Sequence, residues 1–110
     1  NPNINPDYPE DSPDKMQELH QNKNIPFQYL IDENQRIANE FKATCTPDFY
    51  LLNEQMKCIY RGAYDDNWKD SSHVQENYIM DYMHHYSKHK TVHIIKQTPS
   101  MGCSIKWVIN

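Results

Sequence analysis

Hydrophobic residues recur at helical spacing near the end of the chain. The positions that share this period are Val74, Tyr78, Ile79, Tyr82, Met83 and Tyr86, and they predict an amphipathic helix, the best-defined one in the sequence. Nearer the start, Ser12-Pro13 places a preferred N-cap residue before a proline at the first helical position. Met16 and Leu19 then share a face, so we expect this helix to end at about Asn22 or Lys23.

Two shorter elements are expected between these helices. Residues 27–31 form the apolar, β-prone run Phe-Gln-Tyr-Leu-Ile, which predicts a short and mostly buried strand. Asp32 follows directly, and Ile37, Ala38 and Phe41 then recur at helical spacing. We therefore expect Asp32 to cap a second helix.

The middle of the chain predicts an antiparallel hairpin. The runs Phe49 to Leu52 and Lys57 to Arg61 are β-prone, and a polar turn, Asn53-Glu54-Gln55, separates them. The expected order is therefore helix, strand, helix, strand, strand, helix. Residues 1–11 are expected to be an extended or irregular N-terminal segment, and residues 91–110 a C-terminal tail.

Composition narrows the range of functions. A length of 110 residues predicts a single domain, and a hydrophobic fraction of 37% allows only a thin core. The net charge of −4, with acidic and basic residues interspersed, argues against a nucleic-acid partner. No stretch is long and apolar enough to span a membrane. No leader peptide is visible, so we expect a cytoplasmic protein without a membrane partner.

The chain has three cysteines, Cys45, Cys58 and Cys103. An odd number fits free or redox-active thiols better than a fully paired framework, although one disulfide plus one buried thiol stays open. Cys58 lies in the middle of a predicted strand, and we expect it to be a core residue.

Four histidines near the C-terminal helix raise the question of a metal site. They are His84, His85, His89 and His93. No nearby carboxylate or cysteine completes a set of four ligands, as a closed structural zinc site requires. We therefore interpret them as the polar end of an amphipathic helix and expect no metal; nothing in the sequence implies another cofactor.

Cys45 lies two residues before Pro47, which opens the apolar run of the first hairpin strand. A Thr46-Pro47 step at such a point can adopt the cis bond at modest cost. Residues 43–52 (ATCTPDFYLL) resemble the cis-proline loop of the thioredoxin superfamily. Together with residues 99–107 (PSMGCSIKW), they resemble the AhpC/TSA (redoxin, peroxiredoxin-like) branch of that superfamily. Residues 8–12 (YPEDS) and 60–62 (YRG) match it as well.

The resemblance implies an α/β, incomplete thioredoxin-like fold that contains a helix, a strand, a helix, the cis-proline hairpin, a helix and a C-terminal tail. The C-x-x-C or peroxidatic cysteine of the family lies before the segment that matches Asn1, and no C-x-x-C is present. Three explanations stay open: the chain is a fragment, it pairs with another copy or with its own N-terminal half, or it closes into a reduced sheet. An incomplete sheet exposes unpaired backbone groups.

The resemblance also implies the functional residues. Cys45 and Cys103 are candidate redox or resolving thiols, and their pairing as a disulfide is one hypothesis. Thr46 and Pro47 are candidate substrate-binding residues, because the backbone before a cis-proline pairs with a substrate chain in the superfamily. In the alternative interpretation, Cys45 is a packing residue and Cys103 an idle thiol in an anchored tail.

The implied function is that of a thiol-disulfide oxidoreductase or peroxiredoxin-like antioxidant protein, of which this chain is the part without the principal catalytic cysteine. Its substrates would be a thiol or disulfide protein or a peroxide. The alternative is a non-enzymatic interaction or scaffold module on the same frame, because a fold does not determine a function.

Overall fold

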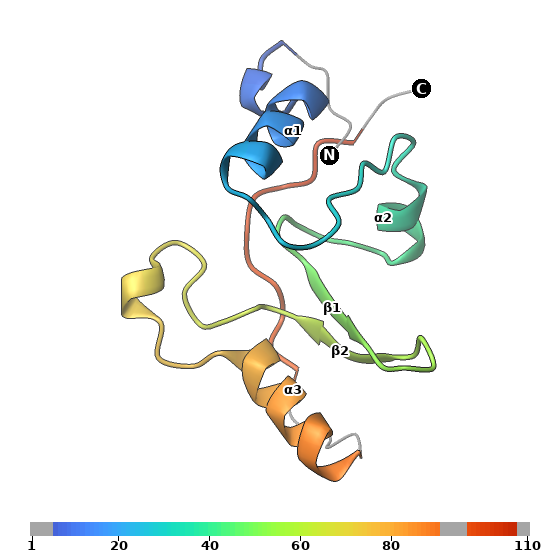
Figure 1. The fold of residues 1–110 in the computed structure, drawn as a ribbon, viewed down its shortest axis with the longest axis vertical. Coiled ribbons are helices and arrows are strands. Elements are labelled where there is room, and N and C mark those ends of the chain that lie inside the picture. The colour runs from blue at the N-terminus through green and yellow to red at the C-terminus, as the bar shows by residue number, and fades with distance from the viewer. Residues whose placement is uncertain (1–5, 91–96, 108–110) are drawn as a thin grey trace. The chain divides into compact units, whose positions relative to one another are not determined.

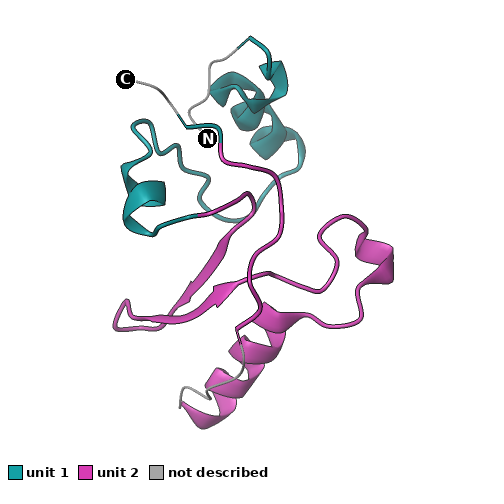
Figure 2. Cartoon of the chain, turned by 180° about the vertical axis from the view of Figure 1, so that it is seen from behind, with its two compact units in different colours: residues 1–43, 106–110 teal, residues 44–105 magenta. Residues whose placement is uncertain are grey.

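The computed structural model describes residues 6–90 and 97–107 (Figure 1). The chain divides into two compact units, which are shown in different colours in Figure 2. Unit 1 contains residues 1–43 and 106–110, and unit 2 contains residues 44–105. Helices and a small antiparallel sheet are both present, in agreement with the predicted α/β class.

In its described residues, unit 1 contains two α-helices, both of which were predicted. Helix α1 (Pro13–Asn22) begins after Ser12, whose hydroxyl accepts a hydrogen bond from the Lys15 amide at 3.3 Å. Helix α2 (Arg36–Glu40) is short. The N-cap residue of this helix is Gln35 rather than the predicted Asp32, but the Asp32 carboxylate accepts hydrogen bonds from two amides of the first turn. The N-terminal segment includes one 3-10 turn, Pro9–Asp11.

Residues 27–31 do not form the predicted strand. The Phe27 carbonyl contacts the His20 ring nitrogen at 3.1 Å, and the Tyr29 hydroxyl donates to the Met16 sulfur at 3.1 Å. The segment is also exposed rather than buried, since Phe27 is 65% and Leu30 76% accessible. A strand requires a hydrogen-bonded neighbour, and among the described residues the only paired strands are β1 and β2 of unit 2.

Unit 2 contains the predicted hairpin. Strands β1 (Phe49–Leu52) and β2 (Cys58–Gly62) pair antiparallel, and the Asn53 side chain accepts hydrogen bonds from two amides of the turn. The prediction that Cys58 is a core residue was wrong, because Cys58 is exposed. It is the first residue of β2 and pairs with Leu52, where the register shifts. The regular alternation of side chains between the two faces of the sheet therefore does not apply there.

Helix α3 (Tyr78–His89) packs against this hairpin. It begins four residues later than the periodicity indicated, because loop contacts to Asp66 hold the backbone of Gln75 and Glu76 outside the helix. The buried core consists of Tyr60, Ile79 and Tyr82, with Phe49, Leu51 and Tyr78 packed around it. The rings of Tyr60 and Tyr82 lie 4.9 Å apart. The core therefore positions the start of β1 and the end of β2.

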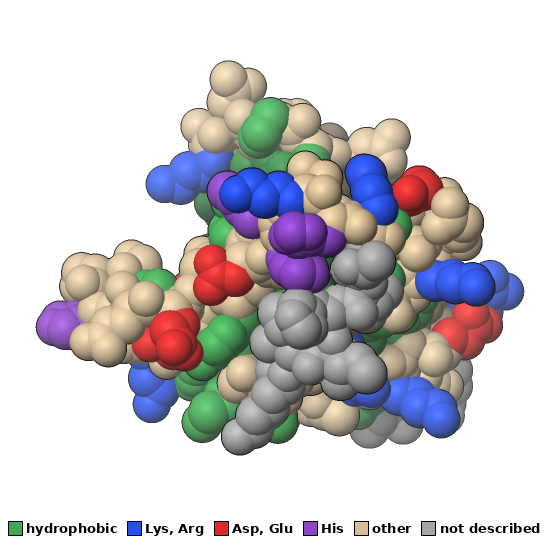
Figure 3. All heavy atoms as spheres, turned by 90° about the horizontal axis from the view of Figure 1, so that it is seen from below, with side chains coloured by type: hydrophobic (Ala, Val, Ile, Leu, Met, Phe, Trp, Pro, Cys, Tyr) green, Lys and Arg blue, Asp and Glu red, His purple; other side chains and the backbone are tan. Residues whose placement is uncertain are grey.

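The surface carries charges of both signs. Figure 3 shows one face, on which acidic, basic and histidine side chains are interspersed with apolar ones. None of the helices in residues 6–90 or 97–107 has the length and apolar character needed to cross a bilayer. The β-prone run at residues 91–95 lies outside the described residues.

We predict that replacing Ile79 with alanine lowers the free energy of unfolding by about 2–5 kcal/mol, the usual cost of removing a buried aliphatic side chain. The matched control is Met83→Ala on the same helix, at a position that is 47% exposed, with an expected change within about 0.5 kcal/mol. Urea unfolding followed by circular dichroism measures both. Equal losses in the two variants would show that this cluster is not the core.

Candidate functional site

The Thr46–Pro47 peptide bond is cis, as predicted. The same loop forms an antiparallel β-bridge with the C-terminal tail, between Thr46 and Cys103. The Thr46 amide donates to the Cys103 carbonyl at 2.8 Å, and the Cys103 amide donates to the Thr46 carbonyl at 2.9 Å. The Thr46 hydroxyl donates to the same Cys103 carbonyl at 3.1 Å. The tail therefore folds back across the cis-proline loop and uses both backbone groups of Thr46.

Both glycines of the chain lie where the tail meets the rest of unit 2: Gly102 belongs to the tail, and Gly62 lies against it. A Cβ atom on Gly102 would overlap the Thr46 carbonyl and lie 3.1 Å from Pro47 Cδ. A Cβ atom on Gly62 would overlap the Thr98 carbonyl, and Gly62 has a φ of +146°, a conformation that favours glycine. The two glycines thus allow two close backbone approaches, one at each end of residues 98–103.

Asp48, directly after the cis-proline, joins the loop, the hairpin and the tail. Its carboxylate accepts hydrogen bonds from the Thr44 amide at 3.1 Å, the Tyr50 hydroxyl at 3.0 Å and the Ser100 hydroxyl at 2.6 Å. The Arg61 guanidinium of β2 lies 3.5 Å from the same group. The Asp48 side chain is only 4% exposed, so a buried carboxylate is satisfied from four directions.

These contacts shift two pKa values. Burial raises the pKa of the Asp48 carboxyl, but the hydrogen bonds from Ser100, Thr44 and Tyr50 and the charge of Arg61 outweigh burial and hold it below its usual value. Burial, together with the hydrogen bond to Asp48, raises the pKa of the Tyr50 hydroxyl to about 12. At neutral pH the pair is therefore a neutral phenol that donates to a carboxylate.

Of the candidate thiols, Cys103 is a residue of the β-bridge itself, and Cys45 directly precedes its other residue, Thr46. Cys45 is half-buried and its sulfur is 3.6 Å from the Pro47 carbonyl oxygen, whereas Cys103 is exposed. All three cysteines are free. The tail pairs Cys103 with Thr46 rather than with Cys45. Trp107 is 47% exposed and belongs to unit 1.

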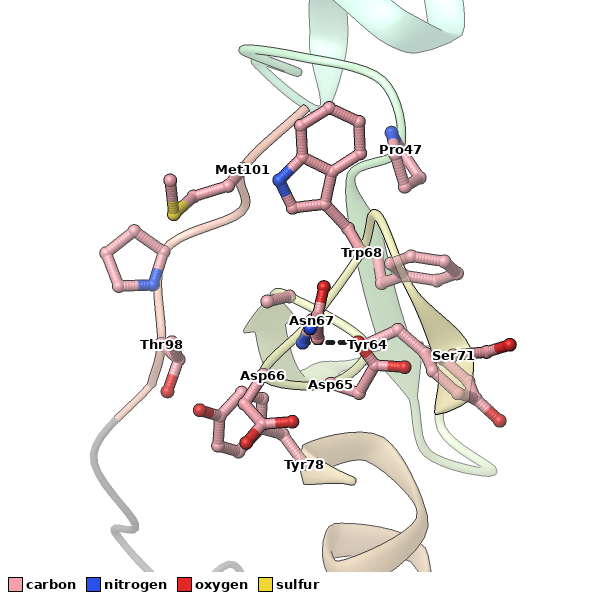
Figure 4. A pocket seen from close by; sticks show the side chains of 13 residues that line it. Pro47, Tyr64, Asp65, Asp66, Asn67, Trp68, Ser71, Tyr78, Thr98 and Met101 are labelled. Atoms are coloured by element: carbon pink, nitrogen blue, oxygen red, sulfur yellow. Dashed lines mark hydrogen bonds between the residues drawn. The ribbon is translucent and has the colours of Figure 1, made fainter. Parts of the chain in front are cut away.

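A pocket of about 390 Å³ adjoins the cis-proline. Figure 4 shows Met101 of the tail, Trp68 and Pro47 along one end of it and Tyr78 at the other. The full lining is Pro47, Phe49, Ala63, Tyr64, Asp65, Asp66, Asn67, Trp68, Ser71, Tyr78, Thr98, Pro99 and Met101. Its volume suits one side chain or a small ligand. The walls are mostly apolar, and the two carboxylates disfavour an anionic occupant.

The sequence pointed to Cys45, Thr46, Pro47 and Cys103, and to the segment that contains Gly102, but it did not indicate the roles of Asp48, Ser100 and Gly62. A signal was present, because a chain with only two glycines has few other places for close backbone approaches. Nothing in the sequence indicated which segment approaches each glycine. No group of three or more metal-ligating side chains occurs in residues 6–90 and 97–107, and His93 lies outside them.

We predict that Asp48→Ala lowers the free energy of unfolding by about 3 kcal/mol, because three donors and one cation lose a buried charged acceptor. Asp48→Asn, which keeps the volume, should lose part of this. The matched control is Asp81→Asn, an exposed carboxylate on α3. Chemical unfolding of the three variants tests the assignment, which an unchanged stability of Asp48→Ala would refute.

We further predict that acid weakens the contact between the tail and Asp48 and so lowers the stability of the folded chain. The pKa of Asp48 in the folded chain lies below its ordinary value. The charged carboxylate therefore stabilises the folded state fully above the ordinary aspartate pKa of about 3.9, and this stabilisation is lost as the pH falls through the pKa of the folded state. Unfolding measured from neutral pH down to about pH 3 should show a steeper loss for the natural chain than for Asp48→Asn. Parallel pH profiles for the two proteins would contradict this role.

Comparison with known proteins gives relatives only among solved structures. No model of a known protein family matches this chain, and no curated protein matches it. An uncharacterized conserved protein from Geobacillus kaustophilus is 38% identical, with a TM-score of 0.79 over 94% of this chain and 55% of its own. A hypothetical protein from Sinorhizobium meliloti 1021 is 30% identical, with a TM-score of 0.81 over 94% of this chain and 57% of its own. The chain therefore spans somewhat more than half the length of each of these solved structures.

Proposed function

We propose that this chain is the cis-proline part of a thiol-disulfide oxidoreductase or peroxiredoxin-like protein with an incomplete thioredoxin-like fold. The observation that carries the proposal is the bridge between Thr46 and Cys103, which holds a cysteine of the tail directly at the cis-proline. In the superfamily that this sequence resembles, that loop faces the reactive thiol. Cys103 is exposed, as a thiol that exchanges with another one must be.

The proposed role of Cys103 is to resolve an oxidised thiol. A thiolate outside this chain attacks a peroxide, which yields an alcohol or water and a sulfenic acid. The Cys103 thiol then condenses with that sulfenic acid, so that an S–S bond forms and water leaves. An external dithiol then reduces this disulfide and regenerates both thiols. Cys45, half-buried beside the loop, is the second candidate for the same step.

The nucleophilic thiol is proposed to lie outside residues 1–110, on a polypeptide part of which covers the exposed apolar side chains of unit 1. Each solved relative is considerably longer than the matched region. All four buried apolar side chains among the described residues belong to unit 2, whereas in unit 1 large apolar side chains are exposed. They are Leu19, Phe27, Tyr29, Leu30, Ile31, Ile37 and Phe41, together with Tyr8 and Trp107. A strand from the remaining segment would pair with residues 27–31 and cover this surface.

The exposed apolar surface of unit 1 also favours a second candidate, a non-enzymatic interaction module. In unit 2, Trp68 is 44% exposed at the pocket and is a residue type enriched in binding interfaces. In that case one of these surfaces binds a partner protein and Cys103 has no exchange partner. The two candidates differ in whether peroxide or disulfide is turned over.

The test uses the longest natural polypeptide that contains this chain. We expect dithiothreitol-dependent consumption of hydrogen peroxide or reduction of insulin disulfides, and a disulfide that links Cys103 to a cysteine outside residues 1–110. Cys103→Ser should remove that link and leave a trappable sulfenic acid. The matched control is Cys58→Ser, an exposed cysteine away from the loop, which should keep both.

Residues 1–110 alone should show no turnover above the free-thiol background, because the nucleophile is absent. Absence of turnover in the longest natural polypeptide as well would favour the interaction module. Full turnover with the Cys103→Ser variant, and no change in the trapped species, would assign the resolving role to another cysteine.

A further inference from the structure

The strand-pairing position of the cis-proline loop is already occupied by this chain itself. A segment that binds a loop by strand addition does so through backbone N–H and C=O groups, which here are those of Thr46. Both of these groups are bonded to Cys103, at 2.8 and 2.9 Å. Figures 1 and 2 show the tail within unit 2, passing the start of the hairpin.

The tail is held at two further points. The Ala63 amide donates to the Thr98 carbonyl at 2.9 Å, and the Ser100 hydroxyl donates to Asp48 at 2.6 Å. Met101 lines the pocket but is 69% exposed, so it contributes little to holding the tail. Residues 98–103 therefore combine backbone pairing with a side-chain anchor, two kinds of contact by which an extended peptide is recognised.

The close approach at Gly102 adds a size restriction. Gly102, the residue before Cys103, lies against the Thr46 carbonyl and Pro47 Cδ. A Cβ atom does not fit at this position. Another polypeptide that took the place of the tail along the same path would meet the same carbonyl. Only a segment with glycine immediately before its paired residue would fit.

We propose that the backbone of Thr46 beside the cis-proline is a peptide-binding edge, and that residues 98–103 of the same chain occupy it. This edge selects extended segments that carry glycine immediately before the residue that pairs with Thr46. This inference rests on the proposed function only in naming a polypeptide substrate. External polypeptides with other residues at that position are excluded, and a segment with a Gly-Cys step must first displace the tail. While the tail is paired with Thr46, the thiol that lies at the loop is that of Cys103.

The test asks whether a free copy of the tail binds once the tethered copy is removed. The receptor is the full chain with Gly102→Val, which should unseat its own tail. The probe is a fluorescently labelled peptide of residues 97–107 that carries Cys103→Ser, so that no disulfide can form. We expect the peptide to bind this variant at least roughly tenfold more tightly than the natural chain. In the natural chain the tethered tail competes with the peptide at a high effective concentration.

Three controls make the result specific. The same peptide with Gly102→Val should not bind either receptor. A second receptor, Ser100→Ala, loses only the anchor to Asp48 and should show an intermediate affinity, whereas Gln97→Ala, an exposed position, should behave as the natural chain. Amide hydrogen exchange at Thr46 should quicken in the Gly102→Val receptor and slow again when the natural peptide is added.

Equal affinity of the peptide for the natural and Gly102→Val chains would overturn the proposal, as would equal binding of the glycine and valine peptides. A Gly102→Val chain that has lost its near-ultraviolet tyrosine signal is unfolded, and the Ser100→Ala receptor then decides. No oxidant or reductant is present, so failure of the redox proposal leaves this test intact, and failure of this test leaves the turnover assay unaffected.

Discussion

The buried carboxylate of Asp48 is the constraint on which the candidate site depends. One side chain accepts hydrogen bonds from the cis-proline loop, from strand β1 and from the tail, and lies beside a cation of β2. A carboxylate that is 4% exposed is tolerable only when its charge is compensated in this way. The loop, the hairpin and the tail therefore form one cooperative arrangement rather than three adjacent segments.

This arrangement explains how a thin core can position a site precisely enough for chemistry. The apolar cluster of Tyr60, Ile79 and Tyr82 fixes helix α3 on the hairpin. At the cis-proline, hydrogen bonds and the close approach of Gly102 to the Thr46 carbonyl hold the tail against the loop. The proposed function needs only what they supply: a cysteine held at the loop by its backbone, with its thiol exposed.

Local patterns predicted the elements of unit 2: periodicity placed α3 and turn chemistry placed the hairpin. The cis bond was predicted from the resemblance of residues 43–52 to a cis-proline loop. The same reasoning failed for residues 27–31, because a β-prone run becomes a strand only beside a hydrogen-bonded neighbour. It also missed Asp48 and Ser100, since a contact across 52 positions leaves no periodic signal.

The proposed site depends most directly on a single pair of residues, Thr46 and Cys103. Scalar couplings across hydrogen bonds, measured by NMR on isotope-labelled protein, report directly on that pair. We expect couplings from the Thr46 nitrogen to the Cys103 carbonyl carbon and from the Cys103 nitrogen to the Thr46 carbonyl carbon. Absence of both couplings, with the Thr46 amide exchanging as fast as in an unfolded chain, would contradict the proposed site.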